Sequence, residues 1–231
     1  MTTRNEPVTI LPRALMLETA SGPRLATRAA AQGSVYGERL LGDLRIWDPF
    51  RSKLASLILS SASATRHLSY LPADCRILYL GAATGTTVSH VSDLFPGGTI
   101  YAVEISPRSM HGLLGLAKAR SNIMPILADA AIPDSYSRLV EPVDLIYQDL
   151  AQRNQADIAL RNARIYLKPG GLLVLMIKAR CIDSTSPVGE ICRSEMGRLT
   201  GFSVLDASPL LPYHQDHLAV LARKISDENP R

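Results

Sequence analysis

Charged side chains follow several apolar runs of the sequence, in positions that suggest a reaction. Lys178 ends a run of six apolar residues, and Asp149 ends a second apolar run. A charge at the end of a buried strand seldom lacks a role, because taking it out of water is costly. General acid–base chemistry is the kind of reaction that such a set supports.

A glycine-rich stretch, Gly81–Thr87, separates a predicted strand from a predicted helix and lets the backbone approach a ligand closely. It has neither the full G-x-G-x-x-G spacing of dinucleotide-binding proteins nor the lysine of a P-loop. Glu104, 23 residues beyond Gly81, is placed to accept hydrogen bonds from ribose hydroxyls, and Asp129 from an adenine amino group. Acids without a phosphate cradle favour the cationic S-adenosylmethionine over a nicotinamide cofactor. The alternative is that Glu104 and Asp129 simply end their strands and bind no ligand.

Strands alternate with helices through most of the chain, which predicts βαβ units and a mostly parallel sheet. In such a sheet ligands bind outside the carboxyl ends of the strands, where the candidate residues fall. A Lys-Pro-Gly-Gly sequence at 168–171 is expected to stop the fourth helix. The periodicity predicts strands over 76–80, 99–104, 122–127, 143–148, 172–178, 202–205 and 218–222, and helices over 52–63, 86–94, 107–120, 156–167 and 187–199.

The 231 residues are expected to form one main domain with a small appendage. Residues 14–28 predict a strand, a turn and a strand, so we expect a β-rich N-terminal element and connector over 1–50 and the main domain over 51–231. Hydrophobic residues make up 46% and charged residues 20%, a balance typical of a folded chain.

Charge and cysteine content limit the classes of partner and site. A net charge of +4 permits a nucleic-acid partner without establishing one. The longest apolar run is too short to span a membrane, so no membrane association is expected. Three cysteines favour a reducing compartment, and neither they nor the histidines show the spacing of metal ligands. Trp47 fits either base stacking or packing, with packing preferred, and His90 fits a packed position.

Several longer motifs resemble the fibrillarin family, in particular its short archaeal members. The departures are mild: Asp48, Thr84, Ile105 and Gln148 stand where the family commonly has Asn, Ser, Phe and Ala, and no acid, lysine or histidine is lost. The matching stretches are Trp47–Lys53, Leu80–Asp93, Tyr101–Ser106, Asp149–Gln152, Ile177–Thr185 and Leu211–His217.

This resemblance implies a Rossmann-like class I S-adenosylmethionine-dependent methyltransferase fold. It implies 2′-O-methylation of ribose in ribosomal RNA, with transfer RNA as an open second substrate. It also implies that target choice is delegated to a particle containing box C/D guide RNA, a Nop-domain scaffold protein and a kink-turn-binding ribosomal-type protein. An archaeal-type chain would act in the cytoplasm.

The resemblance also carries roles onto particular residues. Lys178 would orient or deprotonate the ribose hydroxyl, and Asp149 would stabilise the methyl-donor cation. His217 would share the proton transfer or hold a lysine in place. The catalytic set that the resemblance implies is Lys53, Asp149, Lys178 and His217. A solvated helix start and a packed histidine are the ordinary alternatives for Lys53 and His217. The expected cofactor contacts are Gly81, Ala82, Thr86, Thr87, Glu104, Ile105, Asp129, Ala130, Asp149 and Gln152. The expected RNA contacts are Arg51 and Arg180, within a positive rim that adds Arg39, Arg45, Lys53 and Lys178.

Three rival functions remain at this point. A methyltransferase acting on another acceptor, such as a protein side-chain amide, would use the same cofactor site. A structural subunit of an RNA–protein particle that has lost catalysis would not need the four charged residues. A nucleotide-dependent oxidoreductase would need the missing phosphate cradle.

Overall fold

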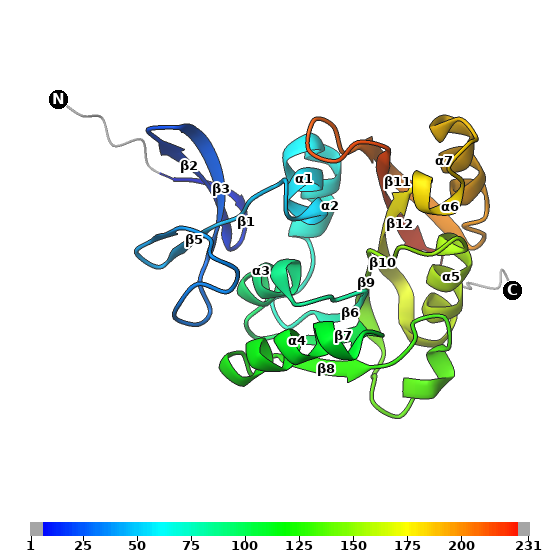
Figure 1. The fold of residues 1–231 in the computed structure, drawn as a ribbon, viewed down its shortest axis with the longest axis horizontal. Coiled ribbons are helices and arrows are strands. Elements are labelled where there is room, and N and C mark those ends of the chain that lie inside the picture. The colour runs from blue at the N-terminus through cyan, green and yellow to red at the C-terminus, as the bar shows by residue number, and fades with distance from the viewer. Residues whose placement is uncertain (1–6, 226–231) are drawn as a thin grey trace, which may run out of the picture.

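A computed structural model describes residues 7–225, and these form a small antiparallel sheet beside a larger mixed sheet (Figure 1). The small sheet has the order β1-β2-β3-β5-β4 and the large sheet the order β11-β12-β10-β9-β6-β7-β8. The strands of the small sheet are β1 (Val8–Leu11), β2 (Ala14–Thr19), β3 (Gly22–Arg28), β4 (Leu40–Leu41) and β5 (Leu44–Ile46). Those of the large sheet are β6 (Arg76–Leu80), β7 (Thr99–Glu104), β8 (Ile123–Leu127), β9 (Val143–Gln148), β10 (Leu167–Lys178), β11 (Phe202–Pro209) and β12 (His217–Lys224).

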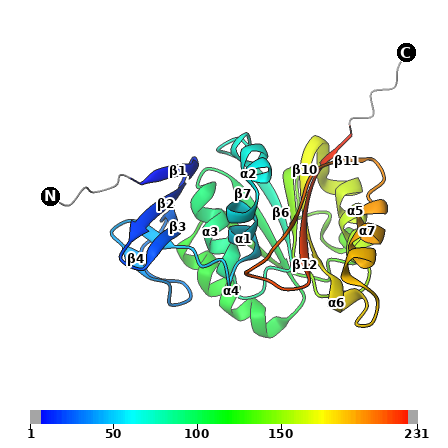
Figure 2. The same ribbon diagram turned by 90° about the horizontal axis from the view of Figure 1, so that it is seen from above.

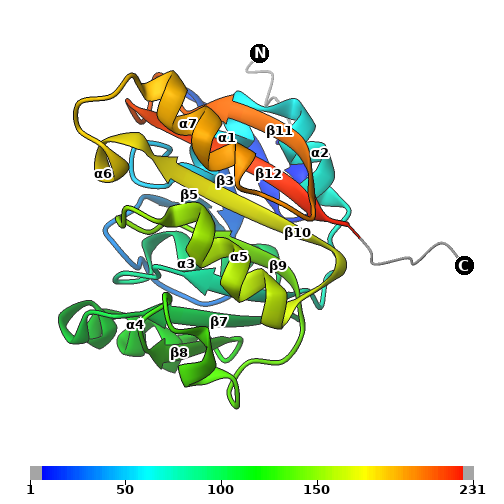
Figure 3. The same ribbon diagram turned by 90° about the vertical axis from the view of Figure 1, so that its right-hand side faces the viewer.

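Helices cover both faces of the large sheet, because its central strands are apolar on both sides. One face packs against the helices α1 to α4 and, through them, against the small sheet (Figure 2). The other face packs against η1, α5 and α7 (Figure 3). The helices are α1 (Lys53–Ser60), α2 (Ala62–Ser69), α3 (Thr86–Leu94), α4 (Pro107–Ala119), the 3₁₀ helix η1 (Pro133–Tyr136), α5 (Gln155–Tyr166), α6 (Ala179–Ile182) and α7 (Val188–Gly197).

The large sheet changes its winding direction between β6 and β9. Strands β6 to β10 are parallel, with β6 paired to β7 on one side and to β9 on the other, while β12 runs antiparallel between β10 and β11. In open α/β sheets, ligands bind at the carboxyl ends of the strands where the order reverses. The expected α/β fold is therefore confirmed, and the switch point is where a site should lie.

Two local expectations are wrong. The helix expected over 52–63 is broken at Ser61, whose extended backbone (φ −136°) ends α1 while its hydroxyl caps α2. The fourth helix does end before 168–171, at Tyr166, but the strand expected to start at 172 starts at Leu167. Residues 168–171 therefore lie inside β10, where the pairing with β9 shifts register between Leu167 and Leu172. Gly170, with φ +73°, lets the strand bulge there without ending.

The N-terminal prediction was incomplete. The strand–turn–strand over 14–28 is confirmed as β2 and β3, but β1, β4 and β5 were missed, and the last two lie in the segment treated as a connector. Short strands form only through pairing with their neighbours, and they contain too few residues to show a periodic apolar pattern. The boundary at residue 50 stays a prediction.

A buried ion network joins the small sheet to the main one. Asp93 of α3 accepts hydrogen bonds at 2.6 Å from Arg45 of β5 and from Arg120 after α4. Arg45 also pairs with Glu38 at 2.6 Å, and its side chain is fully buried. The expectation that Arg45 belongs to a positive rim is therefore wrong, because its charge is neutralised inside the protein. Trp47 is buried and stacks on His90, as preferred from the sequence.

Candidate active site

Three charged side chains meet at the carboxyl edge of the large sheet. Nζ of Lys53 lies 3.1 Å from Oδ2 of Asp149, and Nζ of Lys178 lies 2.8 Å from Oδ1. Each of the three side chains is 16% exposed, so the cluster is reachable from solvent but largely shielded from it. The structure thus brings together three of the four residues expected to carry the reaction, and their roles stay a prediction.

Local structure explains why these side chains converge. Asp149 and Lys178 come from the ends of the neighbouring parallel strands β9 and β10. Lys53 opens α1, whose first turn is capped by the hydroxyl of Ser52. Nζ of Lys178 also donates to the backbone oxygen of Asp149 at 3.1 Å, which ties the two strand ends together.

Asp149 is held in its ionised form. Burial raises the pKa of this carboxyl, but the positive charges of Lys53 and Lys178 lower it more, so the pKa lies below its usual range. Oδ1 has the lysine charge nearby but no aligned hydrogen bond from the described part of the chain. The cluster is therefore held mainly by charge, with a carboxylate between two ammonium groups.

His217 faces this cluster from β12. It is the cross-strand partner of Lys178, so the two side chains lie on the same face of the sheet. Its Nδ1 lies 2.5 Å from the carbonyl oxygen of Gln215. A carbonyl can only accept, so Nδ1 carries the hydrogen and Nε2 is the acceptor of the neutral ring. Burial lowers the pKa of His217, so the ring is largely neutral at pH 7.

His214 is a second histidine at the site, and it was not among the predicted site residues. Its ring centroid lies 5.8 Å from that of His217, and its Nε2 donates to the carbonyl oxygen of Pro49 at 2.9 Å. Burial lowers its pKa, as does the charge of Lys53. His214 therefore fastens the loop before β12 to the segment that leads into α1.

A cavity of about 310 Å³ opens beside the cluster, within the range of small-molecule sites. Gly81 forms its floor with φ +85°, and a Cβ there would lie 2.8 Å from the backbone oxygen of Asp149. Seven expected cofactor contacts line the cavity, and three do not. Those lining it are Gly81, Glu104, Ile105, Asp129, Ala130, Asp149 and Gln152.

The other three expected contacts, Ala82, Thr86 and Thr87, are not among the residues that line the cavity. Ala82 packs in the core, and the hydroxyl of Thr87 donates to Ser52 at 3.0 Å. Thr86 lies at the first position of α3 and is not part of the lining. A glycine loop in sequence does not say which of its residues line a cavity, and here Gly81 and Ala83 do so.

The acids of this cavity are fixed by backbone amides. The carboxylate of Glu104 accepts from the amides of Ala83 and Ser106, each at 2.8 Å. Oδ1 of Asp129 accepts from the amide of Ala131 at 2.8 Å. A carboxylate has about four acceptor positions, so both acids keep capacity for a ligand.

Gln155 is a functional candidate that sequence reasoning missed. Its fully buried side chain accepts from the amide of Lys178 at 2.9 Å and donates to the carbonyl oxygens of Lys178 and Gln152 at 3.3 and 2.8 Å. It thereby joins the strand end that carries the lysine to the loop that lines the cavity. A glutamine at the start of an amphipathic helix carries no sequence signal for this role.

The expected RNA contacts lie on the surface around the site. Arg51 stacks over the ring of Tyr36 at 4.8 Å, and Arg180 donates to the carbonyl oxygens of Ser184 and Ser186. Both side chains keep exposed surface. Their contact with RNA stays a prediction.

Within residues 7–225, no helix is long and apolar enough to cross a membrane. The same residues include no cluster of three or more histidine, cysteine or acidic side chains arranged to hold a metal ion.

The sheet order and the acid-walled cavity at its switch point define a Rossmann-like class I S-adenosylmethionine-dependent methyltransferase. Within that class the chain belongs to the fibrillarin family, whose family model, described as Fibrillarin, matches residues 13–226.

Individual relatives agree with this assignment. The fibrillarin-like rRNA/tRNA 2′-O-methyltransferase of Methanothrix thermoacetophila is 57% identical over 202 residues, covering 87% of this chain and 93% of the relative. A fibrillarin solved in complex with Nop5p is 45% identical with a TM-score of 0.80, covering 87% of this chain and 94% of that chain. Aeropyrum pernix fibrillarin, solved with natively bound S-adenosyl-L-methionine, is 41% identical with a TM-score of 0.80, covering 94% and 99%.

Proposed function

We propose that this chain transfers the methyl group of S-adenosylmethionine to the 2′ oxygen of ribose in RNA, as the catalytic subunit of a box C/D guide-RNA particle. The observation that carries this proposal is the ionised Asp149 between Lys53 and Lys178, at the wall of a cofactor-sized cavity. The names of the relatives support ribosomal and transfer RNA as substrates.

The residues of the cavity fit S-adenosylmethionine. That cofactor supplies, when bound, a methyl group on a cationic sulfonium. Glu104 and Asp129 offer acceptor positions for its hydroxyl and amino groups, and Asp149 offers negative charge for its cationic groups. Gly81 leaves the space that a side chain would fill.

The chain's own residues orient the acceptor and remove its proton. The ammonium groups of Lys53 and Lys178 are fixed by Asp149 and donate to the attacking oxygen, which aligns it for transfer. As this oxygen gains the methyl group it loses its proton, and Nε2 of the neutral His217 takes that proton. Both lysines are paired with Asp149, so the role of base falls to the imidazole.

The partners follow from the same proposal. A Nop-domain scaffold would hold the enzyme, as the Nop5p complex of a relative supports. Guide RNA pairing with the target would supply specificity, and a kink-turn-binding ribosomal-type protein would complete the particle. A cytoplasmic location of the archaeal type suits an enzyme that acts on these RNAs.

The test is methyl transfer from labelled S-adenosylmethionine to guide-paired RNA in the assembled particle. The target carries ribose in one arm and 2′-deoxyribose in the other. Lys178→Ala is compared with the parent and with Lys118→Ala, a change at an exposed lysine of α4. We expect label on ribose only, a loss of at least 100-fold in Lys178→Ala, and parental activity in Lys118→Ala.

Two results would contradict the proposal. Label on a protein that needs no guide RNA would identify a side-chain amide as the acceptor. An assembled particle that binds cofactor but transfers nothing to any ribose would identify a structural subunit.

A further inference from the structure

The loop that joins β11 to β12, residues 210–216, precedes His217 and supplies the acceptor for its ring. The carbonyl oxygen of Gln215 accepts from Nδ1 of His217, and this bond leaves the lone pair of the neutral ring on Nε2. In the other neutral form the hydrogen is on Nε2, which then cannot take a proton. The position of one backbone carbonyl therefore decides whether His217 can act as a base.

The side chain of His214 fixes the loop on one side of that carbonyl. Its Nε2 donates to the carbonyl oxygen of Pro49 at 2.9 Å, in the segment that leads to Lys53. The hydroxyl of Ser56 donates to the same oxygen at 2.7 Å, so this acceptor is itself held in place. Because His214 is next to Gln215 in the chain, its anchor limits where the carbonyl of Gln215 can lie.

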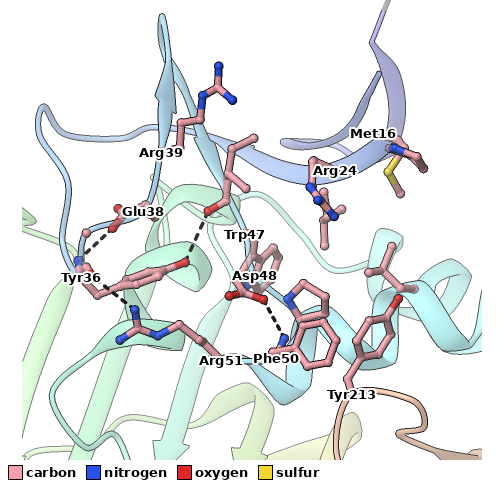
Figure 4. A pocket seen from close by; sticks show the side chains of 16 residues that line it. Met16, Arg24, Tyr36, Glu38, Arg39, Trp47, Asp48, Phe50, Arg51 and Tyr213 are labelled. Carbon is pink, nitrogen blue, oxygen red and sulfur yellow. Dashed lines mark hydrogen bonds between the residues drawn. The ribbon is translucent and has the colours of Figure 1, made fainter. Parts of the chain in front are cut away.

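A second contact joins the same two segments. The ring of Tyr213 meets that of Phe50 edge to face, with centroids 5.2 Å apart, and both rings line a cavity of about 550 Å³ (Figure 4). Two neighbouring residues of the loop, Tyr213 and His214, thus contact two neighbouring residues before α1, Phe50 and Pro49. Two contacts fix the direction of the loop as well as its distance from α1.

Asp216 fixes the loop on the other side of the carbonyl. Its φ of +58° lies in the left-handed region, which a residue other than glycine adopts only when its surroundings hold it there. Its carbonyl oxygen accepts from the amide of Ala179 at 3.1 Å, directly after Lys178. The chain therefore turns at Asp216, between Gln215 and the histidine ring that bonds back to it.

His214 has no direct part in the transfer. Its Nε2 is used by the carbonyl of Pro49, and His214 is not among the residues that line the cavity beside Asp149. The centroid of its ring lies 5.8 Å from that of His217. Any effect of His214 on the reaction must therefore pass through the loop and the base that the loop holds.

We propose, on the basis of the proposed function, that His214 is a positioning residue that keeps the neutral ring of His217 in the form with its hydrogen on Nδ1. Its anchor on the segment before α1 keeps the carbonyl of Gln215 against Nδ1. The same anchor ties the loop to Lys53, which fixes the distance between the base and that ammonium group. The wrong neutral form of a catalytic histidine costs about 10⁴-fold in kcat in an enzyme that depends on it.

The first test is kinetic and uses the assembled particle. His214→Leu removes the donor, whereas His214→Gln keeps an NH₂ donor for the carbonyl of Pro49. We expect kcat to fall at least tenfold in His214→Leu and to stay within about threefold of the parent in His214→Gln. The KM for RNA and the Kd for S-adenosylmethionine should keep their parental values in both. His111→Leu, at an exposed histidine of α4, is the control.

A second pair of variants isolates the turn. Asp216→Gly and Asp216→Val both lose the carboxylate, whose Oδ2 lies 3.5 Å from Nε of Arg180. Glycine adopts a φ of +58° without strain, whereas the β-branched valine does not. We expect kcat to be at least tenfold lower in Asp216→Val than in Asp216→Gly. Equal kcat in the two variants would contradict the need for this turn.

The third measurement observes the ring directly and needs no methyl transfer. In the full-length protein with ¹⁵N-labelled histidine, nitrogen NMR distinguishes the two neutral forms, and His217→Asn identifies the signals of His217. Spectra are taken well above pH 6.5, where the ring is neutral. The charged groups that face the ring, Lys53, Asp149 and Lys178, are the same in every variant compared. The parent and His214→Gln should show the form with hydrogen on Nδ1, and His214→Leu a mixture of both forms.

The outcomes separate this inference from the proposed function. A parental kcat in His214→Leu, or a ring that keeps its hydrogen on Nδ1 in that variant, would overturn the positioning role while ribose methylation stands. A loss in His214→Gln as large as that in His214→Leu would overturn the hydrogen bond as its cause. A parent that methylates no ribose would overturn the proposed function, whereas the NMR signals would still decide whether His214 sets the neutral form of His217.

Discussion

Asp93 holds the small sheet to the main domain through its negative charge. Removing that charge by mutation tests how much the buried ion network contributes to stability. The two carboxylate oxygens of Asp93 accept four hydrogen bonds, from Arg45, Arg120, Thr27 and the amide of Ala30, at 2.6 to 2.8 Å. The change Asp93→Asn keeps the shape and replaces one oxygen by an NH₂ group. That group faces donors on either side, and the two guanidinium groups lose their shared counter-charge.

The magnitude follows from burial. Arg45 keeps Glu38, but Arg120 keeps only the hydroxyl of Ser92 at 3.2 Å. Breaking a buried ion pair by removing one partner costs about 3–5 kcal/mol, because the remaining charge is left unpaired away from water. We expect the free energy of unfolding to fall by about 4 kcal/mol. In a chain of this size the melting temperature would fall by roughly 8–16 °C.

Urea unfolding, followed by Trp47 fluorescence and by far-ultraviolet circular dichroism, measures this loss. The control is Asp43→Asn, which breaks the exposed ion pair with Arg28 and should cost at most about 1 kcal/mol. Adding Arg120→Met to Asp93→Asn should recover part of the loss, because it removes the uncompensated charge. A cost below 1 kcal/mol for Asp93→Asn would refute the view that this network joins the sheets.

Three further predictions concern the site. Gly81→Ala should weaken S-adenosylmethionine binding at least tenfold in calorimetry, because its Cβ meets the backbone of Asp149, whereas Gly115→Ala, with open space around it, should keep parental affinity. The kcat should fall as the pH drops through a value below 6.5, because the lowered pKa of His217 keeps its Nε2 unprotonated until then. The variant His217→Asn should lose this fall at low pH and about 100-fold in kcat. An unchanged dependence of kcat on pH in His217→Asn would exclude His217 as the base. Gln155→Leu should lower kcat at least tenfold and stability by about 1–3 kcal/mol, because three part-buried backbone groups lose their partner. An unchanged kcat at full cofactor occupancy would contradict its positioning role.

Much of the fold was predictable because burial leaves a periodic trace. The strands over 99–104 and 143–148 and the helix over 86–94 have the same bounds in the structure as in the prediction. Each is long enough to show its apolar pattern and is flanked by glycine, proline or polar residues. Where the pattern failed, at Ser61 and at 168–171, one local hydrogen bond or one bulge overrode it.

Long-range contacts left no such trace. Arg45 looks like any surface arginine in sequence, because its partner Asp93 lies 48 residues away on another element. The strand that carries it, β5, has only three residues and is defined by its pairing with β3 and β4. A residue whose environment is built by distant segments cannot be placed from local pattern.

The same distinction divides the candidate site. Asp149 and Lys178 were predictable together because both end apolar strands, and parallel strands bring their carboxyl ends to one edge. Gln155 was not, because its role lies in contacts to backbone groups, which every residue has. The candidate site therefore has two parts. One is the set of charges at the strand ends, which sequence reveals, and the other is a buried amide that holds the end of β10 against the loop that lines the cavity. If alignment limits the transfer, the second part should affect rate as the first does, and Gln155→Leu measures that directly.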